Sequence, residues 1–142
     1  MFDRMNSAPI RVIAAVVHSD ERYLVCLRPP HKRHGGLWEF PGGKCEPNES
    51  DEDTVRRELC EELGLEVVAV GSELLVVADP GSSFIIAFIP AAIRGEPQCR
   101  EHVELRWATL RELLLLPLAP GDRRFAEYLV DSNESAVMTP AS

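Results

Sequence analysis

The sequence lacks a hydrophobic run that would suit a signal sequence or a membrane span. The apolar stretch near its start, Val12 to Val17, has only six residues. That length is too short for either purpose and suits a buried strand. We therefore expect a cytoplasmic protein with no membrane partner.

Cysteines at metal-binding spacing are also missing. The chain has four cysteines and no two of them form a C-x-x-C pair: Cys26, Cys45, Cys60 and Cys99. A zinc site is therefore not expected, and we interpret all four as free thiols in a reducing cytosol.

Positive charge is scarce. Fifteen Lys and Arg residues stand against 23 Asp and Glu residues, which gives a formal net charge of -8. This balance argues against nucleic acid or anionic membranes as main partners. The acidic residues are also concentrated, because the segment Glu46–Glu62 holds eight carboxylates in seventeen residues. Such a surface can bind a small anion only if cations lie between its carboxylates and that anion.

The 142 residues, 45% hydrophobic and 27% charged, fit one globular domain. Periodicity and breakers predict a mixed α/β (α+β) fold, in which helices pack on the faces of a mixed β-sheet. The expected strands are 10–18, 23–28, 65–78, 83–93 and 103–108, and the expected helices are 49–63, 109–116 and 122–130. The domain would span 10–130, between an N-terminal extension (1–9) and a flexible polar C-terminal tail (131–142).

Local signals refine these elements. The strands 10–18 and 23–28 are expected to form a hairpin. Gly71 is a possible bulge, Gly64 a helix stop and Thr109 a helix cap.

The acidic segment contains Glu58, Glu61 and Glu62 at i, i+3 and i+4, beside an apolar stripe of Val55, Leu59 and Leu63. Neighbouring carboxylates on a helix repel by roughly 1–3 kcal/mol per pair, so the cluster is costly without a cation. Magnesium prefers carboxylate oxygens and shares its coordination sphere with phosphates. The alternative is a solvated acidic helix face.

A longer pattern surrounds these glutamates. Nine residues fill every fixed position of G-x5-E-x7-R-E-U-x-E-E-x-G-U, where U is a bulky aliphatic residue: Gly43, Glu49, Arg57, Glu58, Leu59, Glu61, Glu62, Gly64 and Leu65. This stretch, 43–65, resembles the signature box of the Nudix hydrolases. The resemblance runs from about Ile10 to Val130, and it is closest to the MutT-type nucleoside triphosphate pyrophosphohydrolases, in their branch for CTP and modified pyrimidine nucleotides.

The resemblance implies a Nudix fold with Mg²⁺ as cofactor and Mn²⁺ as a possible substitute. It implies that Glu58 and Glu62 are metal ligands, with Glu61 in the same cluster and the carbonyl of Gly42 as a backbone ligand. It also implies that Glu49 and Arg57 brace the loop against the helix through an ion pair.

A further acid is expected from a later loop. Glu101 stands six residues before Trp107, as in MutT-type enzymes, and is a candidate metal ligand or general base. Glu104 is the competing choice, and an ordinary loop acid is the plainer alternative. For the general base, Glu58 is the first candidate and Glu101 the second.

Phosphate contacts are expected from Arg28, twelve residues before Phe40, where the resembling enzymes place an arginine. Lys44 is a second candidate. The alternative is that Arg28 is only an exposed arginine at a strand end and Lys44 an ordinary loop lysine. Lys32 and Arg33 could add phosphate contacts but are more typical of a solvated loop, and His31 and His34 are interpreted as loop residues only.

The nucleobase would meet Phe40 and Asp122. Phe40 matches a base-contacting aromatic of MutT-type enzymes, with a core position as the alternative. Asp122 stands where the oxidised-guanine enzymes carry asparagine, and an ionised aspartate only accepts hydrogen bonds, as from the N4 amino group of cytosine. N-capping of the following helix is the alternative role, so the base stays open.

The resemblance implies attack at the β-phosphorus of a nucleoside triphosphate, release of a nucleoside monophosphate and pyrophosphate, and sanitation of the nucleotide pool. One alternative is a Nudix hydrolase of ADP-ribose, a dinucleotide or a nucleotide sugar. Another is a catalytically silent binding module. The expected partner is a small nucleotide, with no nucleic acid, and the protein would be a monomer or homodimer.

Overall fold

The computed structural model describes residues 9–138, as nine strands and three helices. In chain order they are β1 (Ile10–Val16), β2 (His18–Ser19), β3 (Arg22–Leu27), β4 (Trp38–Glu39), β5 (Gly42–Lys44), α1 (Asp51–Leu63), β6 (Glu66–Val70), β7 (Leu75–Ala78), β8 (Phe84–Arg94), β9 (Glu104–Thr109), α2 (Leu110–Leu115) and α3 (Pro120–Met138). No helix within this part of the chain has the length and apolar character to cross a bilayer.

The larger sheet is mixed. Its centre is β1, which pairs in parallel with the long strand β8 and antiparallel with β5. Strands β6 and β7 both pair antiparallel with β8, at different parts of its length. Both faces of β1 are covered, because its residues Ile13 to Val16 are all buried. This explains why the segment is continuously apolar rather than alternating.

The smaller sheet is antiparallel and has β3 at its centre, paired with β2, β4 and β9. The expected hairpin of strands 10–18 and 23–28 is therefore only partly correct. The chain leaves the larger sheet after Val16, and only His18 and Ser19 pair with the following strand. The first strand finds its partners far along the sequence instead.

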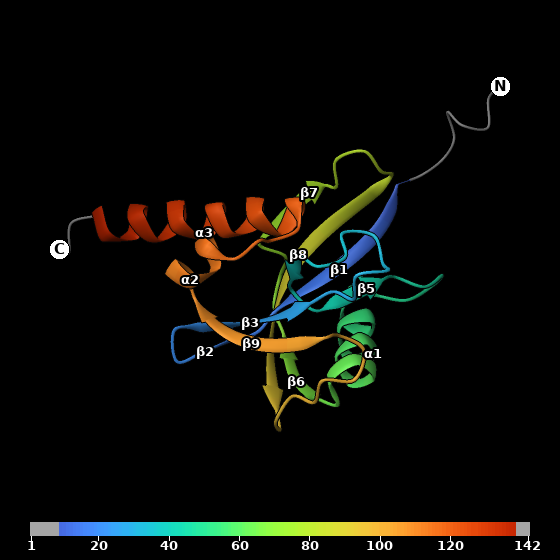
Figure 1. Ribbon diagram of the computed structural model, residues 1–142. Helices are drawn as coiled ribbons and strands as arrows, with labels where there is room; N and C mark the ends of the chain where they lie inside the picture. Colours follow the sequence, from blue (N-terminus) through green and yellow to red (C-terminus); the bar gives the residue numbers. More distant parts are fainter. Residues whose placement is uncertain (1–8, 139–142) are drawn as a thin grey trace.

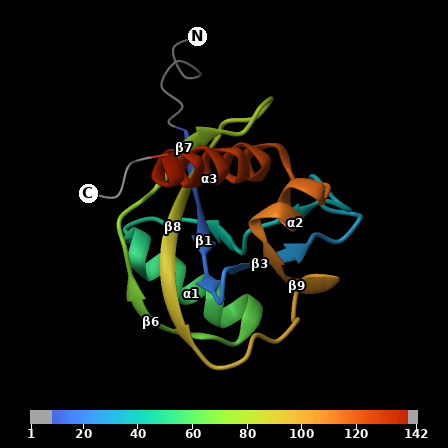
Figure 2. The ribbon, with the colours of Figure 1, turned by 90° about the vertical axis from the view of Figure 1, so that its left-hand side faces the viewer.

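Helices lie on both faces of the larger sheet (Figure 1). On one face Val55, Leu59 and Leu63 of α1 pack in a core cluster with Ile13 and Ala15. On the other face, Phe125 and Ala126 of α3 pack with the intervening β1 residues Ala14 and Val16. Figure 2 shows α3 crossing the strands, with α1 beyond them on the other side. The predicted fold class, a mixed sheet between helices, is confirmed.

Three local predictions were wrong. The register shift in the β6–β8 pairing lies between Val67 and Ala69, so the bulge is not at Gly71, which follows the strand. The last helix begins at Pro120 rather than Asp122 and continues to Met138. Residues 131–138, expected to be an irregular tail, are therefore helical. Residues 1–8 of the expected extension, and 139–142 of the tail, lie outside the described residues.

Candidate active site

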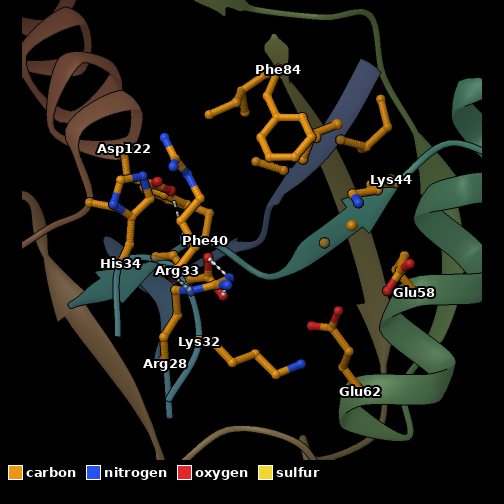
Figure 3. Close-up of a pocket in the computed structure, with 18 of the residues that line it drawn as sticks. Arg28, Lys32, Arg33, His34, Phe40, Lys44, Glu58, Glu62, Phe84 and Asp122 are labelled. Atoms are coloured by element: carbon orange, nitrogen blue, oxygen red, sulfur yellow. Dashed lines mark hydrogen bonds and ion pairs between the residues drawn. The ribbon is translucent and has the colours of Figure 1, made fainter. Parts of the chain in front are cut away.

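A cavity of about 330 Å³ opens between α1, the loop 29–36 and the start of α3. We define its acidic wall as Glu58, Glu62 and Glu101, and its basic wall as Arg28, Lys32 and Arg33. Figure 3 shows Glu58 and Glu62 on α1, facing Arg28 and Arg33 across the cavity. The part farthest from α1, here called the base end, is lined by His34, Phe40 and Asp122.

Local sequence places α1. The Ser50 hydroxyl accepts a hydrogen bond from the Asp53 N–H at 3.1 Å, and three acids in the first turn complement the helix dipole. At the other end Gly64 adopts φ 66°, the left-handed conformation typical of a helix stop. The predicted stop at Gly64 is confirmed. Burial of the apolar stripe fixes the rotation of the helix about its own axis. That rotation decides which glutamates reach the cavity.

The three clustered glutamates have different surroundings. Glu62 is buried and Glu58 is largely covered, and both line the cavity. The Glu61 side chain is 55% exposed, lies outside the cavity lining and contacts Arg57 at 3.3 Å. The structure thus brings two of the three to one place, and a metal-binding role for Glu61 stays a prediction.

The predicted ion pair between Arg57 and Glu49 is present. The Arg57 Nε donates to Glu49 Oε2 at 2.7 Å, and its Nη2 donates to Glu49 Oε1 at 2.9 Å and to the Lys44 carbonyl at 3.0 Å. These hydrogen bonds lower the pKa of Glu49 to about 2. Arg57 also donates to Glu58 at 2.9 Å. One guanidinium therefore ties the loop to α1 and orients a cavity glutamate.

Two glycines let the loop lie against this helix. A Cβ on Gly43 would collide with the Glu58 carboxylate, and one on Gly42 would collide with the Ile13 carbonyl. Both glycines line the cavity. The close approach explains why the pattern needs glycine there. That the Gly42 carbonyl binds a metal stays a prediction.

Glu62 has the properties of a cation ligand without a cation. Its Oε1 is buried and has no hydrogen-bond partner. Burial, together with the neighbouring Glu58, raises the pKa of Glu62 well above its ordinary value. A positive charge beside it would favour the ionised form, as bound dications do for their ligands. The buried carboxyl of Glu62, which lines the cavity, and the close glycine loop thus fit a divalent ion.

The cavity residues fit an open metal site, in which water and substrate complete the coordination, rather than a site closed by protein ligands alone. Among residues 9–138, no group of three or more His, Cys, Asp or Glu side chains is arranged to hold a metal ion. Magnesium commonly takes only one or two carboxylates and completes its sphere with waters and substrate phosphates. The acidic wall offers donors of that kind, while Glu58 is held by Arg57.

The two candidate loop acids are separated by the structure. Glu101 lines the cavity and is close enough to Glu62 to raise its pKa further. Glu104 lies on β9, outside the lining, where it approaches Arg106 at 3.7 Å. The geometry therefore favours Glu101 over Glu104.

Arg28 and the loop 29–36 contribute more side chains to the cavity than the sequence indicated. Arg28 donates to both oxygens of Glu39, at 2.9 and 3.1 Å. Lys32, Arg33 and His34 line the cavity, while Lys32 and Arg33 also stay exposed, as expected of a solvated loop. His31 is exposed and does not line it.

A buried aspartate holds this loop. Asp79, which follows β7, is contacted by Arg33 Nη2 at 3.2 Å and by His34 Nε2 at 3.4 Å. It also accepts a hydrogen bond from the Ser82 hydroxyl at 3.1 Å. These contacts fix Arg33 and His34 against the cavity, from a turn 45 residues away from His34.

Asp122 does not cap α3, because the helix begins two residues earlier. Its Oδ1 accepts the Phe40 N–H at 2.9 Å inside the protein. Burial raises the pKa of Asp122 well above its ordinary value, and Glu39 raises it further. Burial therefore works against the ionised, accept-only carboxylate that the sequence analysis assumed. A neutral carboxyl both donates and accepts.

Phe40 is a core residue, as the alternative prediction held. It makes edge contacts with Phe88 and Phe125 at centroid distances of 5.9 and 5.3 Å. It also lines the cavity beside Asp122.

Lys44 lies 5.2 Å from the centre of the Phe84 ring, and both residues line the cavity.

Comparison with known proteins decides the family. The model of the NUDIX domain matches residues 8–129, which is most of the chain. The chain belongs to the Nudix family.

Relatives of this Nudix hydrolase carry nucleotide-directed names. The CTP pyrophosphohydrolase of Escherichia coli K12 is 40% identical over 116 residues, covering 80% of this chain and 85% of the relative. A putative 8-oxo-dGTP diphosphatase 2 of Mycobacterium tuberculosis is 40% identical over 100 residues, covering 68% and 70%. The solution structure of the E. coli ORF135 protein superimposes with a TM-score of 0.79 at 35% identity, covering 97% of this chain and 98% of that one.

The sequence analysis gave no role to four polar or aromatic residues that line the cavity of this Nudix hydrolase: Glu39, Asp79, Phe84 and His102. Asp79 precedes Pro80 and Gly81, so it is typical of an ordinary turn. Phe84 is typical of a strand core. Glu39 and His102 stand beside the predicted residues Phe40 and Glu101, and that adjacency was the one available signal.

Proposed function

We propose that this Nudix hydrolase uses Mg²⁺, or Mn²⁺ in its place, to hydrolyse a nucleoside triphosphate to a nucleoside monophosphate and pyrophosphate. The observation that carries the proposal is the joint presence, in one cavity, of an acidic wall from α1, a basic wall and an aromatic, buried base end. A triphosphate needs all three: cations beside acids, basic side chains for its remaining charge, and an apolar slot for its base.

The residues divide the work. Glu58, Glu62 and Glu101 would hold the metal, which supplies polarisation of phosphoryl oxygens and a more acidic water. Arg28 and Lys44 bind and orient phosphate oxygens, and Arg57 holds Glu58 in place. Glu58, or else Glu101, accepts the proton of the attacking water at a carboxylate oxygen. Attack at the β-phosphorus, in line with the leaving monophosphate, yields the proposed products.

We infer a CTP-like, modified or oxidised nucleotide as the substrate class, which would make the enzyme a sanitiser of the nucleotide pool. The relatives named for CTP and 8-oxo-dGTP support a triphosphate. At the base end, Asp122 Oδ1 already accepts the Phe40 N–H. The other carboxyl oxygen of Asp122 is therefore the one that meets the edge of the base. A carboxyl there can accept from the N4 amino group of cytosine.

A panel of substrates tests the proposal. Purified protein is incubated with Mg²⁺ and canonical, oxidised or methylated triphosphates, with ADP-ribose and a nucleotide sugar included. We expect a monophosphate and pyrophosphate in equal amounts from at least one pyrimidine triphosphate. Comparable release of ribose 5-phosphate from ADP-ribose would overturn the substrate class. Tight nucleotide binding without turnover under any divalent metal would overturn the activity.

Water labelled with ¹⁸O locates the attack. Label in pyrophosphate, with none in the monophosphate, is expected for attack at the β-phosphorus. Label in the monophosphate would contradict that part of the mechanism and leave the overall reaction standing.

A further inference from the structure

Two buried polar atoms have no hydrogen-bond partner among the described side chains, and they face each other. They are Oε1 of Glu62 and Nδ1 of His102, which lie 4.0 Å apart. Their side chains are 8% and 7% exposed. A buried polar atom without a partner destabilises the fold, so two such atoms in one place indicate a functional arrangement rather than ordinary core packing.

The other side of the His102 ring is firmly held. Its Nε2 lies 3.0 Å from Oε2 of Glu39, and Arg28 donates to both oxygens of the same Glu39. Nε2 therefore carries the proton that Glu39 accepts, and the ring cannot turn without losing this bond. A continuous line of polar contacts thus runs from Arg28 on the basic wall to His102, which faces Glu62 on the acidic wall.

This line fixes how Glu62 presents its two oxygens. Oε1 is buried against His102, while Glu62 as a whole lines the cavity, so the second oxygen is the one available to the cavity. The fixed imidazole ring limits how far this carboxylate can turn. A carboxylate held at one oxygen is pre-oriented at the other.

We propose that His102 is a positioning residue that, braced by Glu39, orients the Glu62 carboxylate for its divalent ion. The inference rests on the proposed function only for the presence of that ion, and it does not depend on which nucleotide is cleaved. It assigns to the loop before β9 a second role besides Glu101. Outer partners of this kind change metal affinity or activity by about 10–100-fold when they are removed.

The test measures Mn²⁺ binding to the free protein, without nucleotide, by calorimetry or by loss of the Mn²⁺ resonance. His102→Leu fills much of the same space but removes both nitrogens. We expect the Kd for Mn²⁺ to rise about tenfold or more in this variant. His18→Leu is the control, because His18 is exposed and lies away from this cavity, and it should bind Mn²⁺ as the wild type does.

Two conservative variants identify which ring nitrogen of His102 acts on Glu62. His102→Asn keeps a polar group near Nδ1, and His102→Gln keeps one near Nε2. The proposal expects Asn to restore more of the Mn²⁺ affinity than Gln. Both variants replace the same buried ring by a polar side chain, so they can be compared with each other even if His102→Leu unfolds. Melting temperatures show whether His102→Leu is folded.

The effect on turnover should be specific too. At saturating metal, kcat of His102→Leu should fall while KM for the nucleotide stays near that of the wild type. Unchanged Mn²⁺ affinity in His102→Leu, or equal affinity in the Asn and Gln variants, would overturn this inference alone. Wild-type protein with no Mn²⁺ binding that depends on Glu62 would overturn it together with the proposed metal site. Mn²⁺ binding with no triphosphate turnover would overturn only the proposed activity.

Discussion

The two walls of the cavity differ in where their residues come from. Glu58 and Glu62 of the acidic wall stand four residues apart on one helix, and the glycines and Arg57 that support them lie within 43–65. The basic wall and the base end combine the loop 29–36, the turn after β7 and the first turn of α3. Glu58 and Glu62 are therefore organised by one short segment, and only Glu101 joins their wall from the loop before β9. The basic wall and the base end exist only after folding.

This difference separates two kinds of physical control. Along α1, capping, i to i+4 spacing and burial of one stripe determine which carboxylates reach the cavity. At the base end, the positions depend on single long-range contacts, such as that between Asp122 and the Phe40 N–H. Changes in the acidic wall should therefore abolish the chemistry, while changes elsewhere should alter substrate affinity or stability.

The largest effect is expected from Glu62→Gln, which preserves shape and removes the negative charge. We expect kcat/KM to fall at least about a thousandfold, because the metal loses a carboxylate, with the melting temperature maintained. Steady-state kinetics and a thermal melt measure both. Glu52→Gln on the exposed side of the same helix is the control, and retained turnover in Glu62→Gln would refute metal binding there.

The next effect distinguishes the two loop acids. Glu101→Gln should lower kcat about a hundredfold, as expected for a lost ligand or general base. Glu104→Gln removes the same charge three residues later, outside the cavity, and should have little effect. The pair is assayed side by side at several Mg²⁺ concentrations. A larger loss in Glu104→Gln would reverse the assignment.

A smaller effect is expected at the aspartate that holds the loop. Asp79→Asn removes the charge that Arg33 and His34 face, so the loop loses its fixed position. We expect KM to rise about tenfold, on the scale of one charge-assisted hydrogen bond, with kcat nearly unchanged. Asp20→Asn, in an exposed turn away from the cavity, is the matched control. A fall in kcat alone would place Asp79 in the chemistry instead.

The smallest effect concerns stability and pH. Burial raises the pKa of Asp122, so its carboxyl stays protonated in the fold at pH values where the unfolded chain ionises it. Its contribution to stability is therefore present below the unfolded pKa of about 3.9 and declines above it. Glu39 strengthens this shift and Arg28 opposes it.

Asp122→Asn keeps an acceptor for the Phe40 N–H and cannot ionise. At pH 7 it should be more stable than the wild type, because burial makes ionisation of Asp122 in the folded protein unfavourable. The difference should disappear near pH 4. Urea unfolding at the two pH values measures it, and a constant difference would contradict the burial argument.

Much of the fold was predictable where the signals are local. The apolar stripe, the Gly64 stop and the Thr109 cap all hold in the structure. The strand partners were less predictable, because β1 pairs with β8 some 70 residues later, as in the match of Ile13 with Ala87. The end of α3 was misjudged, since the polar composition of 131–138 does not prevent a helix from continuing.

The candidate site divides in the same way. The ion pair of Arg57 with Glu49 was expected and is present. The burial of Glu62, the exposure of Glu61 and the choice of Glu101 over Glu104 needed the structure. So did the raised pKa of Asp122, which depends on its burial rather than on its residue type.

The amino-acid order alone determined the acidic helix, its caps and the loop that carries it, because capping, spacing and charge act over a few residues. Only the tertiary structure decided which side chains face those glutamates. His102 meets Glu39 across 63 residues, and Asp122 meets Phe40 across 82. Contacts of that separation leave no periodic trace in a sequence, because they arise when two sheets and two helices close on a common core.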